Sequence, residues 1–321
     1  MNFPVELLKQ CWFLTGPTAV GKTSATLRVA EDFNAEILSL DSMAVYRGMD
    51  IGTAKPAPLE QQSVRHHLID LADPHQEFSV AEYLRAALWA VEDVLNRGRT
   101  PLFSGGTGLY LRAVLRGLFD GPSADWTLRH RMEQLARQHG PGYLHDKLTA
   151  VDPPTAARLH VNDQRRIIRA LEVHAVTGVR LSAQHQNTVL PVTQQPAAVF
   201  WLEPNRDWLR DRIDRRVEKM MQRGLLEETR VLLNTHPAPG RTARQALGYR
   251  ELIAHLEDGL PLQECVDLIK VRTRQFAKRQ HTWFRNMEEC RSIPVRPDEP
   301  EDQLADRILK EFRACDVNSG Q

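Results

Sequence analysis

The chain has 321 residues, of which 42% are hydrophobic and 26% charged, and its 42 Lys and Arg against 41 Asp and Glu give a formal charge of +1. These proportions exclude a fibrous or intrinsically disordered protein, and no run approaches the ~18 apolar residues that cross a bilayer. The four cysteines stand singly, which argues against a disulfide framework or a Cys-x-x-Cys zinc site, and the first ten residues lack the apolar core of a secretory signal. We therefore expect a cytoplasmic protein with one core and one insertion.

In the first 120 residues, short apolar runs alternate with longer stretches of helix-like composition. The runs are 11–14, 36–40, 67–71 and 101–103, and the helical stretches are 22–33, 80–96 and 109–118. Alternation of this kind predicts the α/β class, with a parallel sheet and crossover helices.

The rest of the chain is mainly helical in pattern. Helices are expected at 125–138, 155–160 and 163–176, then a buried strand at 196–202, then helices at 207–233, 244–257 and 261–285. Residues 286–321 are expected to form a less ordered tail with a short helix at 302–313. The predicted organisation is a core of residues 1–123 and 191–285, a helical insertion domain at 124–190 and a C-terminal tail at 286–321.

A phosphate-binding loop follows the first apolar run. Gly16-Pro17-Thr18-Ala19-Val20-Gly21-Lys22-Thr23 fits G-x-x-x-x-G-K-[ST], with an apolar strand before it and a helix after it. The glycines let backbone N–H groups wrap a diphosphate, Lys22 adds a positive charge, and the Thr23 hydroxyl is a ligand for Mg²⁺. The loop predicts a bound diphosphate and a P-loop NTPase-like core, but it leaves the identity of the diphosphate open.

Two further strand ends should lie beside this loop. In an ordinary P-loop NTPase a later strand ends in an acidic residue near the metal, whereas residues 101–103 run into Ser104-Gly105-Gly106-Thr107. The nearest acid is Asp41, after the 36–40 run, so a kinase or NTPase lacks one expected part. Asp41 and Thr107 should meet at the carboxyl edge of the sheet. Taken alone, Asp41 is equally typical of a helix N-cap or turn residue, and Thr107 is more typical of a helix N-cap than of a catalytic residue.

Longer strings carry a specific resemblance. They are DSMAVYRGMDIGTAKP at 41–56, GPTAVGKT at 16–23, HLID at 67–70, SVAEY at 79–83, GGTGLY at 105–110, NDQRRIIRALE at 162–172, ALGY at 246–249, RQFAKRQ at 274–280 and TWFR at 282–285. Taken in chain order, they resemble the tRNA dimethylallyltransferases, the tRNA isopentenyltransferase family, over about residues 11–285. Val20 and Ala44 depart from the Ser and Gln often found at those positions, and Ala44 could alter the contact with the target base.

The resemblance implies a reaction. Such enzymes transfer a dimethylallyl group from dimethylallyl diphosphate to N6 of adenine 37, in tRNAs that read codons beginning with U. The implied partners are the anticodon stem-loop with A36-A37-A38 and the prenyl diphosphate. Residues 16–23 would bind the leaving diphosphate with Mg²⁺ on Thr23, Asp41 would be the catalytic base, and Thr107 would stand at the reaction centre. The target base must be extruded into the pocket.

Basic segments would grip the RNA. Residues 268–285 hold six Lys and Arg and no acid, with Lys270, Arg274 and Lys278 on one helical face. Taken alone, this pattern is typical of a basic helix face exposed to solvent, but the resemblance favours contact with tRNA. In the other implied segment, at 164–169, Ile167 and Ile168 should face the core of the insertion. The implied tRNA-binding residues are Asp41, Ser42, Met43, Ala44, Thr107, Arg129, Gln164, Arg165, Arg166, Ile167, Ile168, Arg169, Arg244, Gln245, Gly248, Tyr249, Arg274, Lys278, Arg279, Gln280, Trp283 and Arg285.

Three alternatives remain beside the tRNA prenyltransferase. An adenylate isopentenyltransferase would share the core but would need neither the insertion nor the basic helix. A P-loop kinase would need the missing acid, and a non-catalytic RNA-binding protein would leave Asp41 and the phosphate loop without a purpose. We expect the enzyme to be a monomer with no membrane partner.

Overall fold

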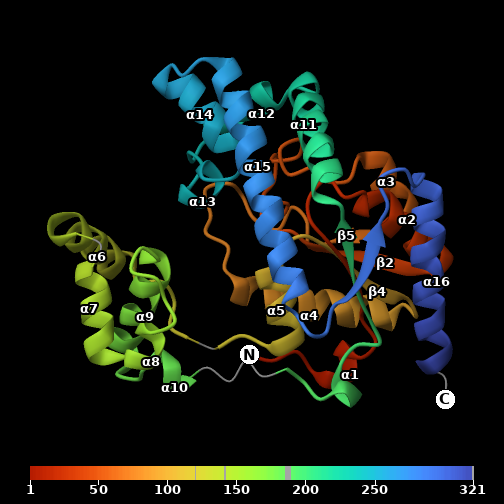
Figure 1. Ribbon diagram of the computed structural model, residues 1–321, viewed down its shortest axis with the longest axis horizontal. Helices are drawn as coiled ribbons and strands as arrows, with labels where there is room; N and C mark the ends of the chain where they lie inside the picture. The colour runs from red at the N-terminus through yellow and green to blue at the C-terminus, as the bar shows by residue number, and fades with distance from the viewer. Residues whose placement is uncertain (120, 141, 185–188, 320–321) are drawn as a thin grey trace. The chain divides into compact units, whose positions relative to one another are not determined.

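A computed structural model describes residues 1–119, 121–140, 142–184 and 189–319, with side chains to Cys315. Six parallel strands form one sheet in the order β3-β2-β4-β1-β5-β6 (Figure 1). They are β1 (Trp12–Thr15), β2 (Ala35–Leu40), β3 (His66–His67), β4 (Thr100–Gly105), β5 (Ala198–Pro204) and β6 (Arg291–Val295). The predicted α/β class with a parallel sheet is confirmed.

Register brings three strand ends together. Gly105 of β4 pairs with Thr15 of β1 on one side and with Leu40 of β2 on the other. The segments that follow these strands, the phosphate loop, the Asp41 turn and the Gly106-Thr107 turn, therefore leave the sheet at one edge. A Cβ on Gly105 would lie 2.5 Å from the Leu40 carbonyl oxygen, so this close approach requires glycine.

Two compact units make up the chain. The sheet unit is Asn2–Arg116 with Val189–Gln321, and the helical unit is Gly117–Thr188 together with Met1. The sheet unit holds α1 (Val5–Leu8), α2 (Lys22–Asp32), α3 (Pro58–Ser63), α4 (Val80–Asn96), α5 (Gly108–Arg116), η1 (Val192–Gln194), α11 (Arg206–Gln222), α12 (Leu225–Leu233), α13 (Arg241–Arg244), α14 (Tyr249–Asp258), α15 (Leu262–Arg285) and α16 (Glu301–Ser319). In its described residues the helical unit contains only helices: α6 (Trp126–His139), α7 (Gly142–Val151), α8 (Pro153–Ala156), α9 (Gln164–Thr177) and α10 (Leu181–Gln184).

Each unit has its own core. In the sheet unit, side chains of β1, β2, β4 and β5 pack with α2 and α16, around Leu14, Ile37 and Phe200. In the helical unit, Leu148 of α7 packs against Ile167 of α9. None of the described helices is both long enough and apolar enough to cross a membrane.

The tail is better ordered than expected, and the helix expected at 302–313 lies within α16. Residues 291–295 form β6 beside β5, and α16 packs on α2. The reason is non-local burial: the Phe312 ring is fully buried against Trp12, Phe33 and Phe200, partners more than a hundred residues away in the chain. No local pattern shows this contact.

Three other boundaries differ from the sequence prediction. The 67–71 strand is limited to His66–His67, because Leu68 and Asp70 take left-handed φ of 63° and 54°. The single helix expected at 207–233 divides at Gly224, with φ 97°, into α11 and α12. The helix expected at 155–160 is instead Pro153–Ala156, because the prolines occupy the first turn after the Asp152 cap.

Candidate active site

The phosphate loop joins β1 to α2 and folds around its own lysine. Lys22 Nζ donates to the carbonyl oxygens of Gly16, at 2.8 Å, and Pro17, at 2.6 Å. Gly16 and Gly21 take φ of 152° and 97°, which favour glycine, and a Cβ on Gly16 would meet Leu202 of β5 at 3.2 Å. The loop is therefore shaped by close packing against β5, and it delivers Lys22 at the start of α2.

A second cation faces this lysine from α11. Burial, followed by the charge of Arg216, lowers the pKa of Lys22 to about 7, and Asp41 opposes the shift. Arg216 is itself half-buried, and burial lowers its pKa while the charge of Asp41 raises it. Two cations and one carboxylate thus converge at the phosphate loop. Arg216 was not among the residues predicted from the sequence. Its position in a helix with several basic residues is a weak signal, because that pattern does not show which way the side chain points.

Asp41 and Thr107 are brought together through Ser42. Asp41 Oδ1 accepts hydrogen bonds from the N–H groups of Met43, at 2.8 Å, and Ala44, at 3.2 Å. Thr107 Oγ1 accepts from the Ser42 N–H at 3.1 Å. Asp41 is therefore a turn residue, as one alternative held, but the two bonds use one carboxylate oxygen and do not engage Oδ2. The charge of the same carboxylate raises the pKa of Lys22 and of Arg216, so Asp41 lies beside the phosphate loop.

Gln280 of α15 joins two of these loops. Its side-chain oxygen accepts from the Thr18 N–H, and its amide nitrogen donates to the Gly106 carbonyl, both at 2.9 Å. Its side chain is buried, and a Cβ on Gly106 would lie 2.2 Å from its nitrogen. Trp283, one turn further along α15, is packed against Gly108 and lies 5.2 Å from the Arg112 guanidinium. These contacts fix the end of α15 to the loops.

The residues expected to bind tRNA differ in burial and pairing in the structure. Five are half-buried: Asp41, Ser42, Met43, Thr107 and Trp283. Exposed side chains are Gln164, Arg165, Arg166, Gln245, Lys278, Arg279 and Arg285. Side chains paired with acids are Arg129 and Arg169 with Glu172, Arg244 with Glu257, and Arg274 with Asp214. Buried ones are Ala44, Ile167, Ile168, Tyr249 and Gln280, besides the backbone of Gly248. A buried side chain does not contact RNA in this conformation, so the last group fits a supporting role better.

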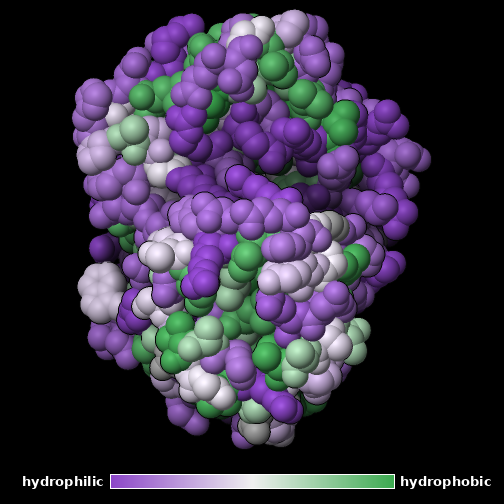
Figure 2. Space-filling model, turned by 90° about the vertical axis from the view of Figure 1, so that its left-hand side faces the viewer, coloured by the Kyte–Doolittle hydropathy of each residue, from purple (hydrophilic) through white to green (hydrophobic). Residues whose placement is uncertain are grey.

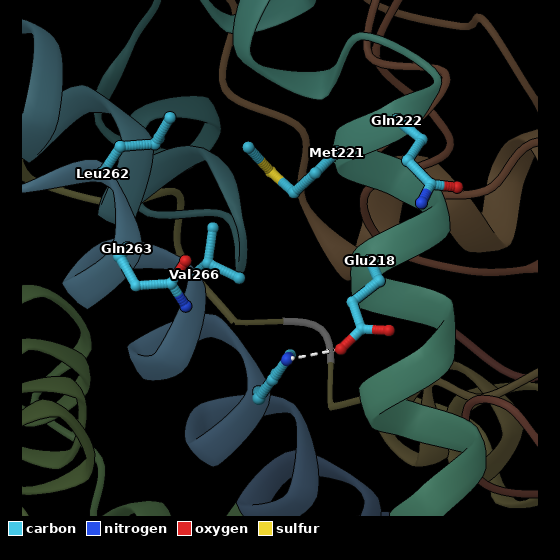
Figure 3. Close-up of a pocket in the computed structure, with 7 residues that line it drawn as sticks. Glu218, Met221, Gln222, Leu262, Gln263 and Val266 are labelled. Carbon is cyan, nitrogen blue, oxygen red and sulfur yellow. Dashed lines mark hydrogen bonds and ion pairs between the residues drawn. The ribbon is translucent and has the colours of Figure 1, made fainter.

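The surface agrees with a polar partner. Figure 2 shows a face on which hydrophilic residues predominate and hydrophobic ones gather only in small groups. A separate groove of about 530 Å³ lies between α11 and α15 (Figure 3). Met221, Leu262 and Val266 line it, and Lys270 bonds to Glu218 across it at 2.8 Å. It contains none of the predicted catalytic residues.

The oxygen groups near Lys22 fit a magnesium ion that arrives with a diphosphate. Thr23 is exposed in the first turn of α2, and the Asp41 carboxylate is near enough to Lys22 for its charge to raise the lysine pKa. Among the described residues no cluster of three His, Cys, Asp or Glu could hold a metal by itself. Mg²⁺ commonly binds through one or two protein oxygens plus substrate phosphates and waters, which matches this donor set.

Comparison with known proteins decides the family. The family model described as IPP transferase matches residues 44–287. This chain belongs to the IPP transferase family. The tRNA dimethylallyltransferase of Symbiobacterium thermophilum is 48% identical over 301 residues, 94% of each chain. That of Desulforudis audaxviator is 46% identical over 282 residues, 88% of this chain and 91% of the relative. The resemblance inferred from the motifs is thus confirmed.

Solved structures of IPP transferases share the fold of this family member. The full-length tRNA isopentenylpyrophosphate transferase of Bacillus halodurans superposes with a TM-score of 0.68 at 37% identity, covering 98% of this chain and 100% of that one. A eukaryotic dimethylallyltransferase acting on tRNA gives a TM-score of 0.76 at 26% identity, over 95% of this chain and 79% of its own. The P-loop NTPase-like core predicted from the sequence agrees with these structures.

Proposed function

We propose that this enzyme transfers a dimethylallyl group from dimethylallyl diphosphate to N6 of adenine 37 in tRNA. The substrates are tRNAs with the anticodon stem-loop sequence A36-A37-A38, which read codons beginning with U. The observation that carries the proposal is the convergence of Lys22, Arg216 and Asp41 at one strand edge, in a chain of the IPP transferase family. Two cations suit a leaving diphosphate, and a carboxylate suits an amine that must lose a proton.

The cations act on the leaving group. As the bond between the allylic carbon and the bridging oxygen breaks, diphosphate departs with the electron pair, and the phosphate-loop N–H groups, Lys22 and Arg216 stabilise its charge. Mg²⁺, held by Thr23 and the diphosphate, would supply further charge neutralisation when bound. The allylic carbon then forms its new bond to N6.

Asp41 and Thr107 act on the amine. N6 of adenine is a weak nucleophile, and it must lose a proton once the carbon–nitrogen bond forms. Asp41, held by two N–H bonds through Oδ1, presents Oδ2 as the proton acceptor. Thr107 is tied to the same turn through Ser42, so its hydroxyl is placed to orient the amine.

The RNA is held by exposed basic groups. On the sheet unit these are Lys278, Arg279 and Arg285 of α15, and on the helical unit Arg165 and Arg166 of α9. Phosphate contacts of this kind position the stem-loop without reading its sequence, while the extruded adenine enters the pocket. We expect the enzyme to act in the cytoplasm as a monomer.

A two-label experiment tests the proposal. Unmodified tRNA with A36-A37-A38 is incubated with labelled dimethylallyl diphosphate and Mg²⁺, and in parallel with γ-labelled ATP. Label should reach tRNA from the prenyl donor alone, and a tRNA with guanine at position 37 should stay unlabelled. Transfer to free AMP but not to tRNA would indicate an adenylate isopentenyltransferase. Phosphate release from ATP without prenyl transfer would indicate a kinase or NTPase.

A further inference from the structure

Glu228 of α12 holds a loop that is far from it in the chain. Its Oε2 accepts hydrogen bonds from the N–H groups of Asp50, at 3.0 Å, and Ile51, at 2.8 Å. Its Oε1 accepts from the Gly52 N–H at 3.1 Å and from the Tyr249 hydroxyl at 2.6 Å. One carboxylate thus engages three successive backbone N–H groups and a phenol, from partners at least 21 residues away along the chain.

The contact is tightly packed and leaves little freedom to the loop. A Cβ on Gly52 would lie 2.4 Å from Tyr249 Cε2, so the backbone touches the ring directly. Tyr249 is buried, and burial followed by the charge of Glu228 raises its pKa far above the usual range, so the phenol remains a donor. Hydrogen bonds from neutral donors to a carboxylate are about twice as strong as those between neutral groups.

A chain of contacts leads from this loop to Asp41. Lys55 Nζ donates to Asp50 Oδ1 and to the Tyr46 carbonyl oxygen, each at 2.6 Å. The backbone just before Tyr46 is held by the bond from Asp70 N–H to the Ala44 carbonyl, at 3.1 Å. Ala44 N–H in turn bonds to Asp41 Oδ1. Every step is a hydrogen bond or a peptide link, so a shift at residues 50–52 is transmitted toward the carboxylate.

We propose that Glu228 is a positioning residue for the transfer reaction: it anchors the 50–52 loop and thereby sets the place of Asp41. The inference rests on the proposed function only for the role of Asp41. Glu228 reaches neither the phosphate loop nor the Gly106-Thr107 turn in the bonds that hold it, so it acts through Asp41 and not on the diphosphate. Misplacing a catalytic group by 1 Å can cost about a hundredfold in rate.

The test replaces Glu228 with Gln and uses its neighbour as the control. Glu228→Gln keeps the size but turns an NH₂ donor toward a backbone N–H, which breaks part of the anchor. Glu227→Gln makes the same change one residue earlier, where the exposed carboxylate pairs with Arg230 on its own helix. We expect the kcat of Glu228→Gln to fall about tenfold or more, with KM for dimethylallyl diphosphate within about twofold of wild type. Glu227→Gln should match wild type.

Hydrogen exchange of the folded variants separates positioning from general damage. In Glu228→Gln the amides of residues 50–52 and also those of Met43 and Ala44 should exchange faster, while the phosphate-loop amide of Thr18 stays protected. Glu228→Asp, which keeps the charge on a shorter side chain, should restore part of both kcat and protection.

Each remaining outcome has a definite meaning. An unchanged kcat, or faster exchange at 50–52 without any change at Met43 and Ala44, overturns the proposal. A general loss of protection, including Thr18, also overturns it, because Glu228 would then only stabilise the fold. If wild-type enzyme transfers no prenyl group at all, the proposed function fails, and the exchange pattern alone still decides whether Glu228 positions Asp41.

Discussion

The two carboxylate oxygens of Asp41 differ in their hydrogen bonds. Oδ1 closes its own turn by accepting from Met43 and Ala44 N–H, while Oδ2 takes no part in those bonds. The sequence alone left a turn residue and a catalytic carboxylate as equal alternatives. The structure shows the turn, and the charge of the Asp41 carboxylate acts on Lys22, so the proposed catalytic role is compatible with the turn.

Replacing Asp41 should separate chemistry from binding. Asp41→Asn keeps an oxygen for the turn but removes the proton acceptor, so the single-turnover transfer rate should fall roughly 10²- to 10⁴-fold. tRNA affinity, measured by filter binding, should stay close to that of wild type. Asp211→Asn, at an exposed position on α11, serves as the control. A parallel loss of tRNA binding and activity would contradict the base role.

Lys22 should make diphosphate binding depend on pH. Because its folded-state pKa is lowered to about 7, Lys22 loses its charge as pH rises through 7, whereas in an unfolded chain it would stay charged to much higher pH. A bound diphosphate favours the charged form, so binding at pH 8 should take up a proton and affinity should weaken from pH 7 upward. Calorimetry in two buffers of different ionisation enthalpy measures the uptake.

The matched variant for this test is Lys22→Arg. Arginine keeps its charge throughout the range, so the proton uptake should disappear even if the affinity itself changes. An affinity of the wild-type enzyme that is constant from pH 7 to pH 9 would show that Lys22 stays charged in the free protein.

Among the helices, α15 shows how tertiary pairing changes the meaning of a basic face. The spacing places Lys270, Arg274 and Lys278 on one side, as expected. In the structure α11 lies along that side, so Lys270 pairs with Glu218 and Arg274 with Asp214. Lys278 and Arg279 remain exposed, two residues and one residue before Gln280, which holds the phosphate loop.

The double variant Lys278→Ala with Arg279→Ala should weaken tRNA binding. Losing two phosphate contacts should lower the slope of log affinity against log salt by roughly 1 to 2. KM for dimethylallyl diphosphate should change little, because both side chains are exposed and belong to α15, outside the phosphate loop. The same pair of changes at Lys310 and Arg313 on α16 is the control. An unchanged salt slope would mean that this end of α15 is a basic surface exposed to solvent and does not bind tRNA.

The whole molecule consists of two units with separate cores, and this allows the RNA-gripping role of the helical unit to be tested alone. Its interior is organised by Glu172, whose buried carboxylate bonds to Arg129, Arg169 and the Asp125 N–H. These pairs hold α6 to α9. Two of the arginines expected to contact tRNA therefore stabilise the unit as well.

Glu172→Ala should destabilise the helical unit by about 3 kcal/mol, because it leaves two arginines facing a buried gap. Proteolysis should then cut within residues 117–188, tRNA affinity should fall, and calorimetry should still detect binding of dimethylallyl diphosphate by the sheet unit. Asp146→Ala, at an exposed position on α7, is the control. If tRNA binding survives while the helical unit is cleaved, that unit does not grip the RNA.

The sequence by itself determined the phosphate loop, the α/β sheet, the helical stretch of the insertion and the family. These follow from local patterns in the sequence: apolar runs of strand length, glycines at fixed spacing, and long stretches that resemble the sequences of the family. Asp41 and Thr107 could be predicted as neighbours because carboxyl ends of parallel strands share one edge.

Only the tertiary structure decided the rest. It brought the charge of Arg216 near Lys22, bound Gln280 to two loops, paired Lys270 and Arg274 with α11, and made β6 and α16 part of the sheet unit. Glu228 and Tyr249 meet the 50–52 loop across about 180 and 200 residues of chain, which no local pattern encodes. The physical reason is the same throughout: periodicity reports which face of an element is apolar, but the direction of a polar side chain depends on which distant partner packs against it.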